Sequence, residues 1–151
     1  MADVVDKETR SRMMSGITGK NTKPELQVRK ALHGMGYRYR LHVRNLPGTP
    51  DIVLPKFRSA IFVNGCFWHG HDCHLFKIPG TRTKFWRDKI AGTRARDISK
   101  RAALLDCSWR VATVWECALK GRTKLGIQDV VDQIARWLSS NSSGLEIRGT
   151  G

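Results

Sequence analysis

The chain has 151 residues, a length that fits one domain whose core needs no disulfide bonds. Its 27 Lys and Arg residues against 13 Asp and Glu residues give a formal charge of +14, which predicts binding to a polyanion, most commonly nucleic acid. No apolar run approaches the roughly 20 residues that cross a bilayer. Residues 1–8 lack the apolar stretch of a signal peptide, so a cytoplasmic protein is expected rather than a secreted or membrane-spanning one.

Residues 5–19 are predicted to form a separate amphipathic helix, with Met14 and Ile17 on its apolar side. Two interpretations remain open for this segment. Its methionine stripe can pack on the main domain, or the segment can be an arm that lies along DNA and inserts an apolar side chain into the minor groove.

A second helix is predicted to start at Thr22, where Thr22 and Glu25 form a capping box with Pro24 in the first turn. Leu26 and Leu32 lie on its apolar face, and Gly36 ends it. Glu25 is thereby explained as a capping residue, so the pattern alone gives it no catalytic role.

Three strands are predicted to follow as an antiparallel meander, at residues 37–43, 51–54 and 60–63. The first alternates apolar residues with Arg38, Arg40 and His42, which predicts a half-buried strand with a basic outer face. Turns containing Pro, Gly or a basic residue separate the three strands.

Later elements complete an α/β domain. Thr83 is predicted to cap a helix over residues 83–90, followed by a basic segment with its own apolar side. Residues 109–117 alternate as a fourth strand, which is expected to join the sheet in parallel because a helix precedes it. An amphipathic helix is predicted over residues 127–138, and the Ser-, Asn- and Gly-rich tail 139–151 is predicted to be disordered.

A metal-binding loop follows the third strand. The loop contains five cysteine and histidine residues that could bind a metal ion: Cys66, His69, His71, Cys73 and His74. A sixth candidate, Cys117, ends the fourth strand. Four ligands suffice for a structural zinc, and the distant cysteine would tie the loop to the sheet. The spacing does not decide which histidine binds the metal. Cys107 has no such neighbours and is expected to be an ordinary core residue.

Asp51 stands at the start of a strand, after a turn rich in Pro and Gly. An Asp in this position is often only a turn residue. However, the strand pair brings it towards Val63, Asn64 and the histidine loop, where a carboxylate and a backbone carbonyl suit a hard cation such as Mg²⁺. The adjacent aromatic rings of Phe67 and Trp68, in so basic a protein, indicate a surface that stacks on bases.

These motifs together resemble the very-short-patch repair (Vsr) DNA mismatch endonuclease family of bacteria, over about residues 3–138. The likeness is carried by Thr9-Arg10-Ser11, Pro47-Gly48-Thr49-Pro50-Asp51, Ile61-Phe62-Val63-Asn64-Gly65-Cys66-Phe67-Trp68-His69, Thr81-Arg82-Thr83-Lys84-Phe85-Trp86 and Val114-Trp115-Glu116-Cys117-Ala118-Leu119. It implies a restriction-endonuclease-like core, a mixed β-sheet flanked by helices, with an N-terminal arm (residues 1–20) and an endonuclease domain (residues 21–138).

The activity implied is a nick in double-stranded DNA, 5′ to the thymine of a T:G mismatch left by deamination of 5-methylcytosine. The resemblance also implies a monomer at the bacterial nucleoid, working with mismatch-repair proteins. It implies one structural Zn²⁺ held by Cys66, His71, Cys73 and Cys117. Two catalytic Mg²⁺ ions would share Asp51, helped by the backbone carbonyl of Val63.

The resemblance further makes Glu25 an active-site carboxylate and leaves His69 for proton transfer. The residues that would enter or flank the DNA stack are Phe67, Trp68 and Trp86 on the domain, and Met14 and Ile17 on the arm. Asn64 stands where the family often has a second catalytic histidine, and Asn cannot shuttle a proton near neutral pH. Two alternatives therefore remain, a zinc-containing DNA-binding module without catalysis and a nickase of the same fold with another target.

Overall fold

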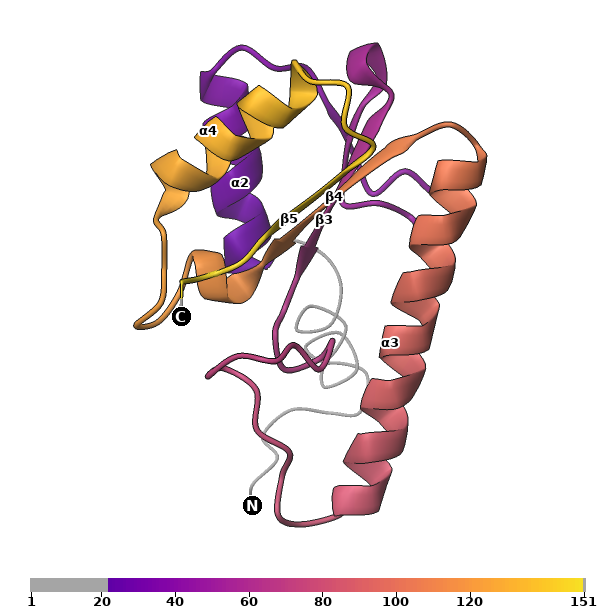
Figure 1. The fold of residues 1–151 in the computed structure, drawn as a ribbon, viewed down its shortest axis with the longest axis vertical. Coiled ribbons are helices and arrows are strands. Elements are labelled where there is room, and N and C mark those ends of the chain that lie inside the picture. Colours follow the sequence, from indigo (N-terminus) through magenta and orange to yellow (C-terminus); the bar gives the residue numbers. More distant parts are fainter. Residues whose placement is uncertain (1–21, 151) are drawn as a thin grey trace, which may run out of the picture.

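A five-stranded mixed sheet lies between helices in the computed structural model, which describes residues 22–150 (Figure 1). The helix expected at residues 5–19, with Met14 and Ile17, lies outside these described residues. The strands are β1 (Arg40–Leu41), β2 (Ile52–Leu54), β3 (Ser59–Asn64), β4 (Arg110–Trp115) and β5 (Gly144–Ile147). The helices are α2 (Lys23–Gly34), α3 (Thr83–Asp106) and α4 (Ile127–Leu138), with short 3₁₀ turns at Pro55–Phe57 and Glu116–Ala118.

The sheet order is β1-β2-β3-β4-β5, so each strand pairs with its neighbour in the sequence. The first three strands pair antiparallel, and β3 pairs with β4 in parallel, as the sequence predicts. The long α3 makes the crossover between β3 and β4, which a parallel connection requires. The carboxyl ends of β3 and β4 consequently lie side by side, with Val63 opposite Val114 and Asn64 opposite Trp115.

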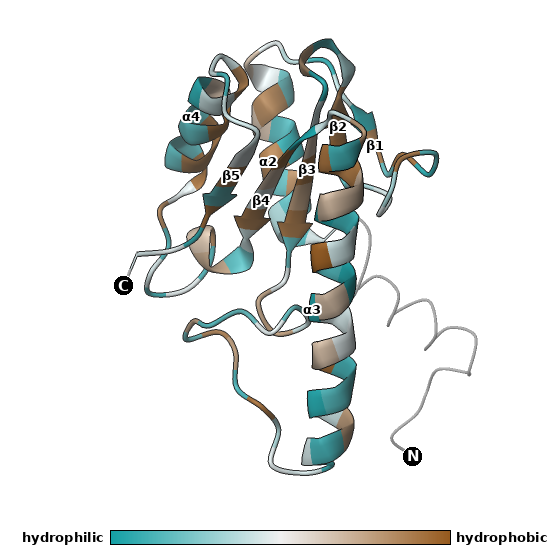
Figure 2. Cartoon of the chain, turned by 45° about the vertical axis from the view of Figure 1, so that its right-hand side comes forward, coloured by the Kyte–Doolittle hydropathy of each residue, from teal (hydrophilic) through white to brown (hydrophobic). Residues whose placement is uncertain are grey.

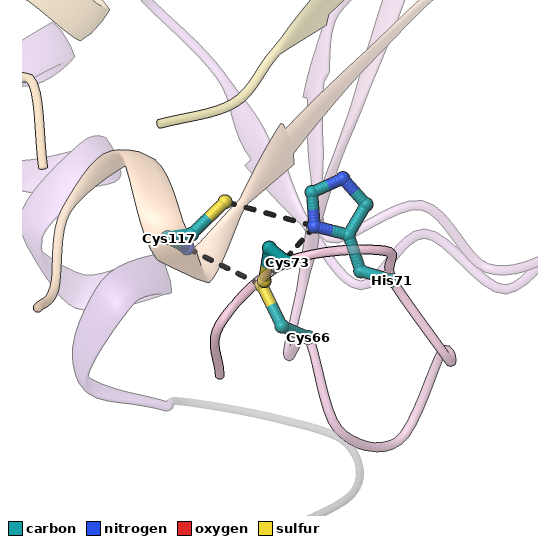
Figure 3. A group of neighbouring side chains, drawn as sticks. All are labelled: Cys66, His71, Cys73 and Cys117. Carbon is teal, nitrogen blue, oxygen red and sulfur yellow. Dashed lines mark hydrogen bonds between the residues drawn. The ribbon is translucent and has the colours of Figure 1, made fainter. Parts of the chain in front are cut away.

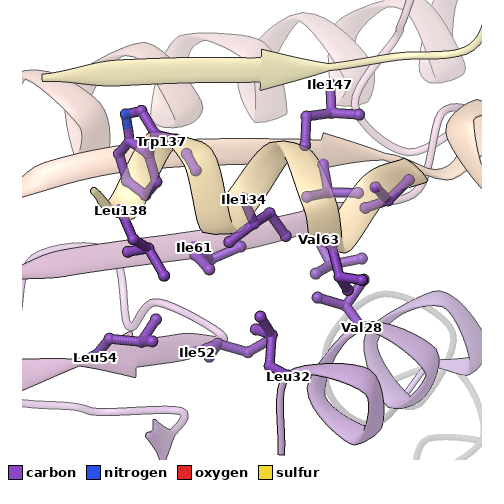
Figure 4. Packing of buried hydrophobic residues seen from close by; sticks show 14 of the residues in the cluster. Val28, Leu32, Ile52, Leu54, Ile61, Val63, Ile134, Trp137, Leu138 and Ile147 are labelled. Atoms are coloured by element: carbon purple, nitrogen blue, oxygen red, sulfur yellow. The ribbon is translucent and has the colours of Figure 1, made fainter. Parts of the chain in front are cut away.

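Alternation along β3 divides the core between the two faces of the sheet. Ile61 and Val63 face α2 and α4, where they meet apolar side chains such as Leu32 and Ile134 (Figure 4). Ala60 faces the other way and packs with Leu104 of α3. Figure 2 shows apolar residues concentrated in β2, β3 and β4, which are buried on both faces.

The start of α2 follows the predicted cap. Thr22 Oγ1 accepts a hydrogen bond from the backbone N–H of Glu25 at 3.4 Å, and Pro24 lies in the first turn. Gly36 follows the helix with a φ of 91°, a left-handed conformation that favours glycine. Among residues 22–150, no helix combines the length and the apolar character that a bilayer-spanning segment needs.

Three predicted elements differ from the structure. The strand expected over residues 37–43 is reduced to β1 and ends at Leu41, because His42 adopts a left-handed φ of 47° that a strand cannot continue. The helix expected over residues 83–90 continues without a break to Asp106 and is not capped by a Thr83 side chain, whose Oγ1 instead donates to the carbonyl oxygen of Pro79 at 2.9 Å. Cys107, expected in the core, is exposed because it follows the last turn of α3.

The tail beyond Ser139 is also ordered in part, contrary to the prediction of disorder. Residues 144–147 form β5, which pairs in parallel with β4 and buries Ile147. Glu146 accepts a hydrogen bond from Trp115 Nε1 at 3.0 Å. Four residues are too few for an alternating pattern that would identify a strand in the sequence. The strand is stabilised by its pairing with β4, which only the tertiary fold brings next to it.

Candidate active site and metal centre

A cleft of about 660 Å³ lies at the carboxyl end of β3. Its walls come from the start of α2, the turn before β2, the end of β3, the loop after β3 and the middle of α3. Six residues selected from the sequence line it together: Asp51, Val63, Asn64, Phe67, Trp68 and His69. Lys23, Lys100 and Lys120 also line the cleft and make its walls attractive to phosphate.

Asp51 lines this cleft directly before β2, and its side chain is held by the neighbouring strand β3. Its Oδ2 accepts a hydrogen bond from the backbone N–H of Val63 at 2.8 Å. The pKa of Asp51 is raised to about 7, mainly by burial and to a smaller extent by the nearby carboxylate of Glu25, whereas the hydrogen bond from the Val63 N–H and the charge of Lys100 act to lower it. A buried carboxylate with so raised a pKa is characteristic of a site that holds a cation or a proton for chemistry.

Glu25 lies beside Asp51 and is 1% exposed. Its Oε2 accepts a hydrogen bond from Arg29 at 3.0 Å and lies 2.9 Å from Nε2 of His42. One ligand atom each from Glu25, His42 and Asp51 lies within 4.8 Å of the other two, a spacing that can accommodate a metal ion. The sequence pattern predicted His42 on the outer face of a strand and did not identify it as a site residue. No local sequence signal marks the left-handed backbone conformation that turns its side chain towards Glu25.

His69 is oriented by a carboxylate that sequence reasoning also missed. Its Nδ1 lies 2.6 Å from Oδ2 of Asp97, which α3 brings to the loop from 28 residues away in the sequence. A carboxylate only accepts hydrogen bonds, so Nδ1 carries the proton and Nε2 is the nitrogen that can exchange one. Asn64 is buried and lines both the cleft and a small pocket that Asp97 and Lys100 also line.

The cysteines and one histidine of the loop converge on a common point with Cys117 (Figure 3). Nδ1 of His71 lies 3.5 Å from Sγ of Cys66 and 3.6 Å from Sγ of Cys117. A tetrahedral ion with bonds of about 2.0 Å to nitrogen and about 2.3 Å to sulfur requires a nitrogen–sulfur separation of about 3.5 Å. The cluster of Cys66, His71, Cys73 and Cys117 can therefore bind a metal ion, and the histidine that the spacing left undecided is His71.

The surroundings of this cluster favour a bound ion. Burial raises the pKa of the thiols of Cys66 and Cys117 and lowers that of His71, so the thiolates need a cation to compensate their charge. Backbone N–H groups of Cys117 and Gly149 each donate to a cysteine sulfur at 3.3 Å. The His71 ring stacks on Trp115, with ring centroids 4.0 Å apart, which fixes its orientation.

The segment after β5 packs against the metal cluster through Arg148 and Gly149. Arg148 donates to Oδ1 of Asp72 at 2.8 Å and to its carbonyl oxygen at 3.0 Å, joining the segment after β5 to the loop. A Cβ on Gly149 would come within 2.5 Å of the carbonyl oxygen of Cys117 and 2.7 Å of that of Thr123. Arg148 and Gly149 thus form one wall of the metal centre.

We therefore expect Gly149→Ala to lower the free energy of unfolding by about 1–3 kcal/mol, because backbone atoms must move to admit the methyl group. Gly34→Ala is the matched control, since a Cβ there meets nothing within 4 Å. Urea unfolding of both variants measures the difference. A Gly149→Ala protein as stable as the wild type would contradict the tight packing of this wall.

Aromatic rings gather beside the cleft. The half-buried rings of Phe67, Trp68 and Trp86 contact one another, with centroids 5.3 to 5.7 Å apart. The helix that carries Trp86, α3, also carries six exposed basic residues along its length: Lys84, Arg87, Lys89, Arg94, Arg96 and Arg101. Figure 1 shows that the N-terminal half of α3 extends past the end of the sheet, alongside the loop. A surface of rings and cations next to a cleft with carboxylates is suited to nucleic acid.

Comparison with known proteins gives consistent matches. The model of a family described as "DNA mismatch endonuclease Vsr" matches residues 2–75. The chain is 47% identical to the type II nicking enzyme V.XorIIP of Xanthomonas oryzae pv. oryzae, over 87% of this chain and 98% of the relative. It is 42% identical to the DNA mismatch endonuclease Vsr of Escherichia coli, over 97% of this chain and 94% of the relative. A type II nicking enzyme of Neisseria meningitidis, V.NmeAIP, is 43% identical over 81% of this chain and 87% of the relative.

Proposed function

Because the chain belongs to the Vsr family and is a DNA endonuclease, we propose that it nicks duplex DNA 5′ to the thymine of a T:G mismatch. The observation that carries the proposal is the position of Asp51 and His69 on one cleft, with Glu25 beside Asp51 and the rings of Phe67, Trp68 and Trp86 next to the cleft. The order of strands and the crossover helix support a restriction-endonuclease-like core. In this proposal the protein acts as a monomer at the nucleoid, with mismatch-repair proteins as partners.

We assign Zn²⁺ to Cys66, His71, Cys73 and Cys117, because sulfur and imidazole donors in tetrahedral spacing are its usual set. We assign two Mg²⁺ ions to the cleft, held by Asp51 and the backbone carbonyl of Val63 with Glu25 nearby. When bound there, Mg²⁺ neutralises charge that builds up on the scissile phosphate. Lys100 and Lys120 attract the phosphate and Asn64 holds an oxygen or a water by its amide.

His69 is the residue that moves a proton in this proposal. Asp97 holds the proton of Nδ1, so Nε2 takes one from the attacking water or gives one to the leaving 3′ oxygen. The products are a 3′-hydroxyl and a 5′-phosphate. The rings of Phe67, Trp68 and Trp86 enter the stack beside the mismatch, with Met14 and Ile17 of the N-terminal segment across the groove; unstacking costs a few kcal/mol and least at a mismatch.

Asp97→Asn tests the positioning of His69. We expect nicking to fall by about 100- to 10,000-fold, the range that general acid–base catalysis contributes, with duplex affinity retained. Asp88→Asn is the matched control, because Asp88 is an exposed aspartate on the same helix. Single-turnover nicking rates measure the effect. An Asp97→Asn protein as fast as the Asp88→Asn control would remove Asp97 from the mechanism.

Incubation with Mg²⁺ and three labelled duplexes, containing T:G, T:A or C:G at one position, tests the function itself. We expect a nick 5′ to the mismatched thymine at a rate at least about 100-fold above the matched duplexes, equivalent to about 2.7 kcal/mol. Equal cutting of all three would identify a nickase with another target. A shifted but uncut T:G duplex would identify a DNA-binding module without catalysis.

A further inference from the structure

We infer that His42 is a direct ligand of the cation held by Asp51 and Glu25, and that its nitrogen makes the cleft select Mn²⁺ over Mg²⁺. The inference rests on the proposed function, since it takes the cleft around Asp51 as the catalytic cation site. Asp51 and Glu25 enter that proposal as carboxylates, whereas His42 has no role in it.

The distances suit coordination by all three side chains. Nε2 of His42 and Oε2 of Glu25 are 2.9 Å apart. Two neighbouring ligands of an octahedral cation with bonds of about 2.1 Å are about 3.0 Å apart, and two opposite ones about 4.2 Å. The ligand atoms of Glu25, His42 and Asp51 all lie within 4.8 Å of one another. A cation bound between them therefore needs only a small inward movement of the side chains.

The backbone holds His42 in place for this contact. Its N–H donates to the carbonyl oxygen of Asp51 at 3.0 Å, so a backbone hydrogen bond next to the β1–β2 pairing holds the two residues side by side. The left-handed φ of 47° interrupts the alternation of β1 at this residue. The His42 side chain is 15% exposed and lies against Glu25 instead of on the basic outer face. Arg29 donates to the same oxygen of Glu25 and fixes the orientation of that carboxylate.

The chemistry of the donors decides which cation is preferred. Mg²⁺ is a hard ion that takes oxygen ligands and loses water reluctantly. Mn²⁺ accepts carboxylates equally well and also binds an imidazole nitrogen, which Mg²⁺ gains little from. Two carboxylates and one imidazole, with the remaining positions open to water or phosphate, are a donor set suited to Mn²⁺. To coordinate through Nε2, the ring keeps its proton on Nδ1.

The test is direct cation binding to the zinc-loaded protein without DNA, with Mn²⁺ followed by electron paramagnetic resonance and Mg²⁺ by competition against it. We expect Mn²⁺ to bind at least about 10-fold more tightly than Mg²⁺. His42→Asn should lower Mn²⁺ affinity by about 10- to 100-fold and Mg²⁺ affinity by less than about 3-fold, so the preference disappears. Asparagine is chosen because it tolerates the left-handed backbone.

His33→Asn is the matched control, because His33 is an exposed histidine of α2 that does not line the cleft. If His42→Asn melts below the assay temperature, His42→Gln gives the same comparison. An unchanged Mn²⁺ to Mg²⁺ ratio in the His42 variant would overturn the inference, whatever the nicking activity. A wild-type protein with the expected ratio that cuts no T:G duplex in either metal would overturn the proposed function and leave the cation site standing.

Discussion

Asp51→Ala is expected to reduce Mg²⁺-dependent nicking of a T:G duplex by at least about 1,000-fold, while affinity for the duplex changes by less than about 3-fold. The loss corresponds to roughly 4 kcal/mol of transition-state stabilisation, the scale that a catalytic metal ion supplies. Binding is retained because the cations of α3 and the rings beside the cleft, which contact the duplex in our proposal, are left intact. Single-turnover nicking and a gel-shift titration measure the two quantities separately.

The environment of Asp51 allows the effect of a substitution on nicking to be distinguished from its effect on stability. Burial and the adjacent Glu25 raise its pKa to about 7, so the ionised carboxylate is held at a cost in stability unless a cation is bound. Asp51→Asn keeps an acceptor for the Val63 N–H and removes that charge. We therefore expect Asp51→Asn to unfold at the same temperature as the metal-free wild type or above it, and still not to nick.

Asp106→Ala serves as the control, since Asp106 is an exposed aspartate at the end of α3. It should nick at the wild-type rate. If Asp51→Ala or Asp51→Asn nicked within a few-fold of this control, Asp51 would not be the ligand of the catalytic cation. The cleft would then serve only to bind DNA.

The parts of the fold that could be predicted are those whose residues carry a long local pattern. The apolar spacing of Val130, Val131 and Ile134 fixes α4, and the alternation along β4 fixes a strand whose parallel pairing follows from the preceding helix. In contrast, β5 has four residues and is stabilised by its partner β4. Its Gly144 and exposed Glu146 resemble a loop when the sequence is considered alone.

The site divides in the same way. Cys66, Cys73 and Asp51 could be selected because residue type and local spacing restrict their chemistry. His42 and Asp97 could not, because what matters about each is a partner far away in the sequence, Glu25 for one and His69 for the other. The choice of His71 over His69 and His74 also depends on the direction in which each ring points. An irregular loop has no regular alternation of side chains from which this direction could be predicted.

Loss of the metal from the cysteine cluster is expected to destabilise the whole domain. Residues 65–82 form no helix or strand, yet they carry His69 and two of the rings beside the cleft, Phe67 and Trp68. A loop of that length is ordered at an entropic cost, which bonds from a metal ion to the loop and to Cys117 would offset. We expect Cys117→Ser, or removal of the metal by a chelator, to lower the melting temperature by about 10 °C or more, equivalent to a loss of about 4 kcal/mol.

Cys107→Ser gives a matched control, since Cys107 is exposed and lies outside the cluster. It should retain one zinc per chain and the wild-type melting curve, whereas Cys117→Ser should lose both. Nicking should decline together with the metal content, because without the metal the loop no longer holds His69 and Trp68 at the cleft next to Asp51. A Cys117→Ser protein that kept its zinc and its melting temperature would show that the loop is held by its aromatic and apolar contacts, and the metal centre would lose its structural role.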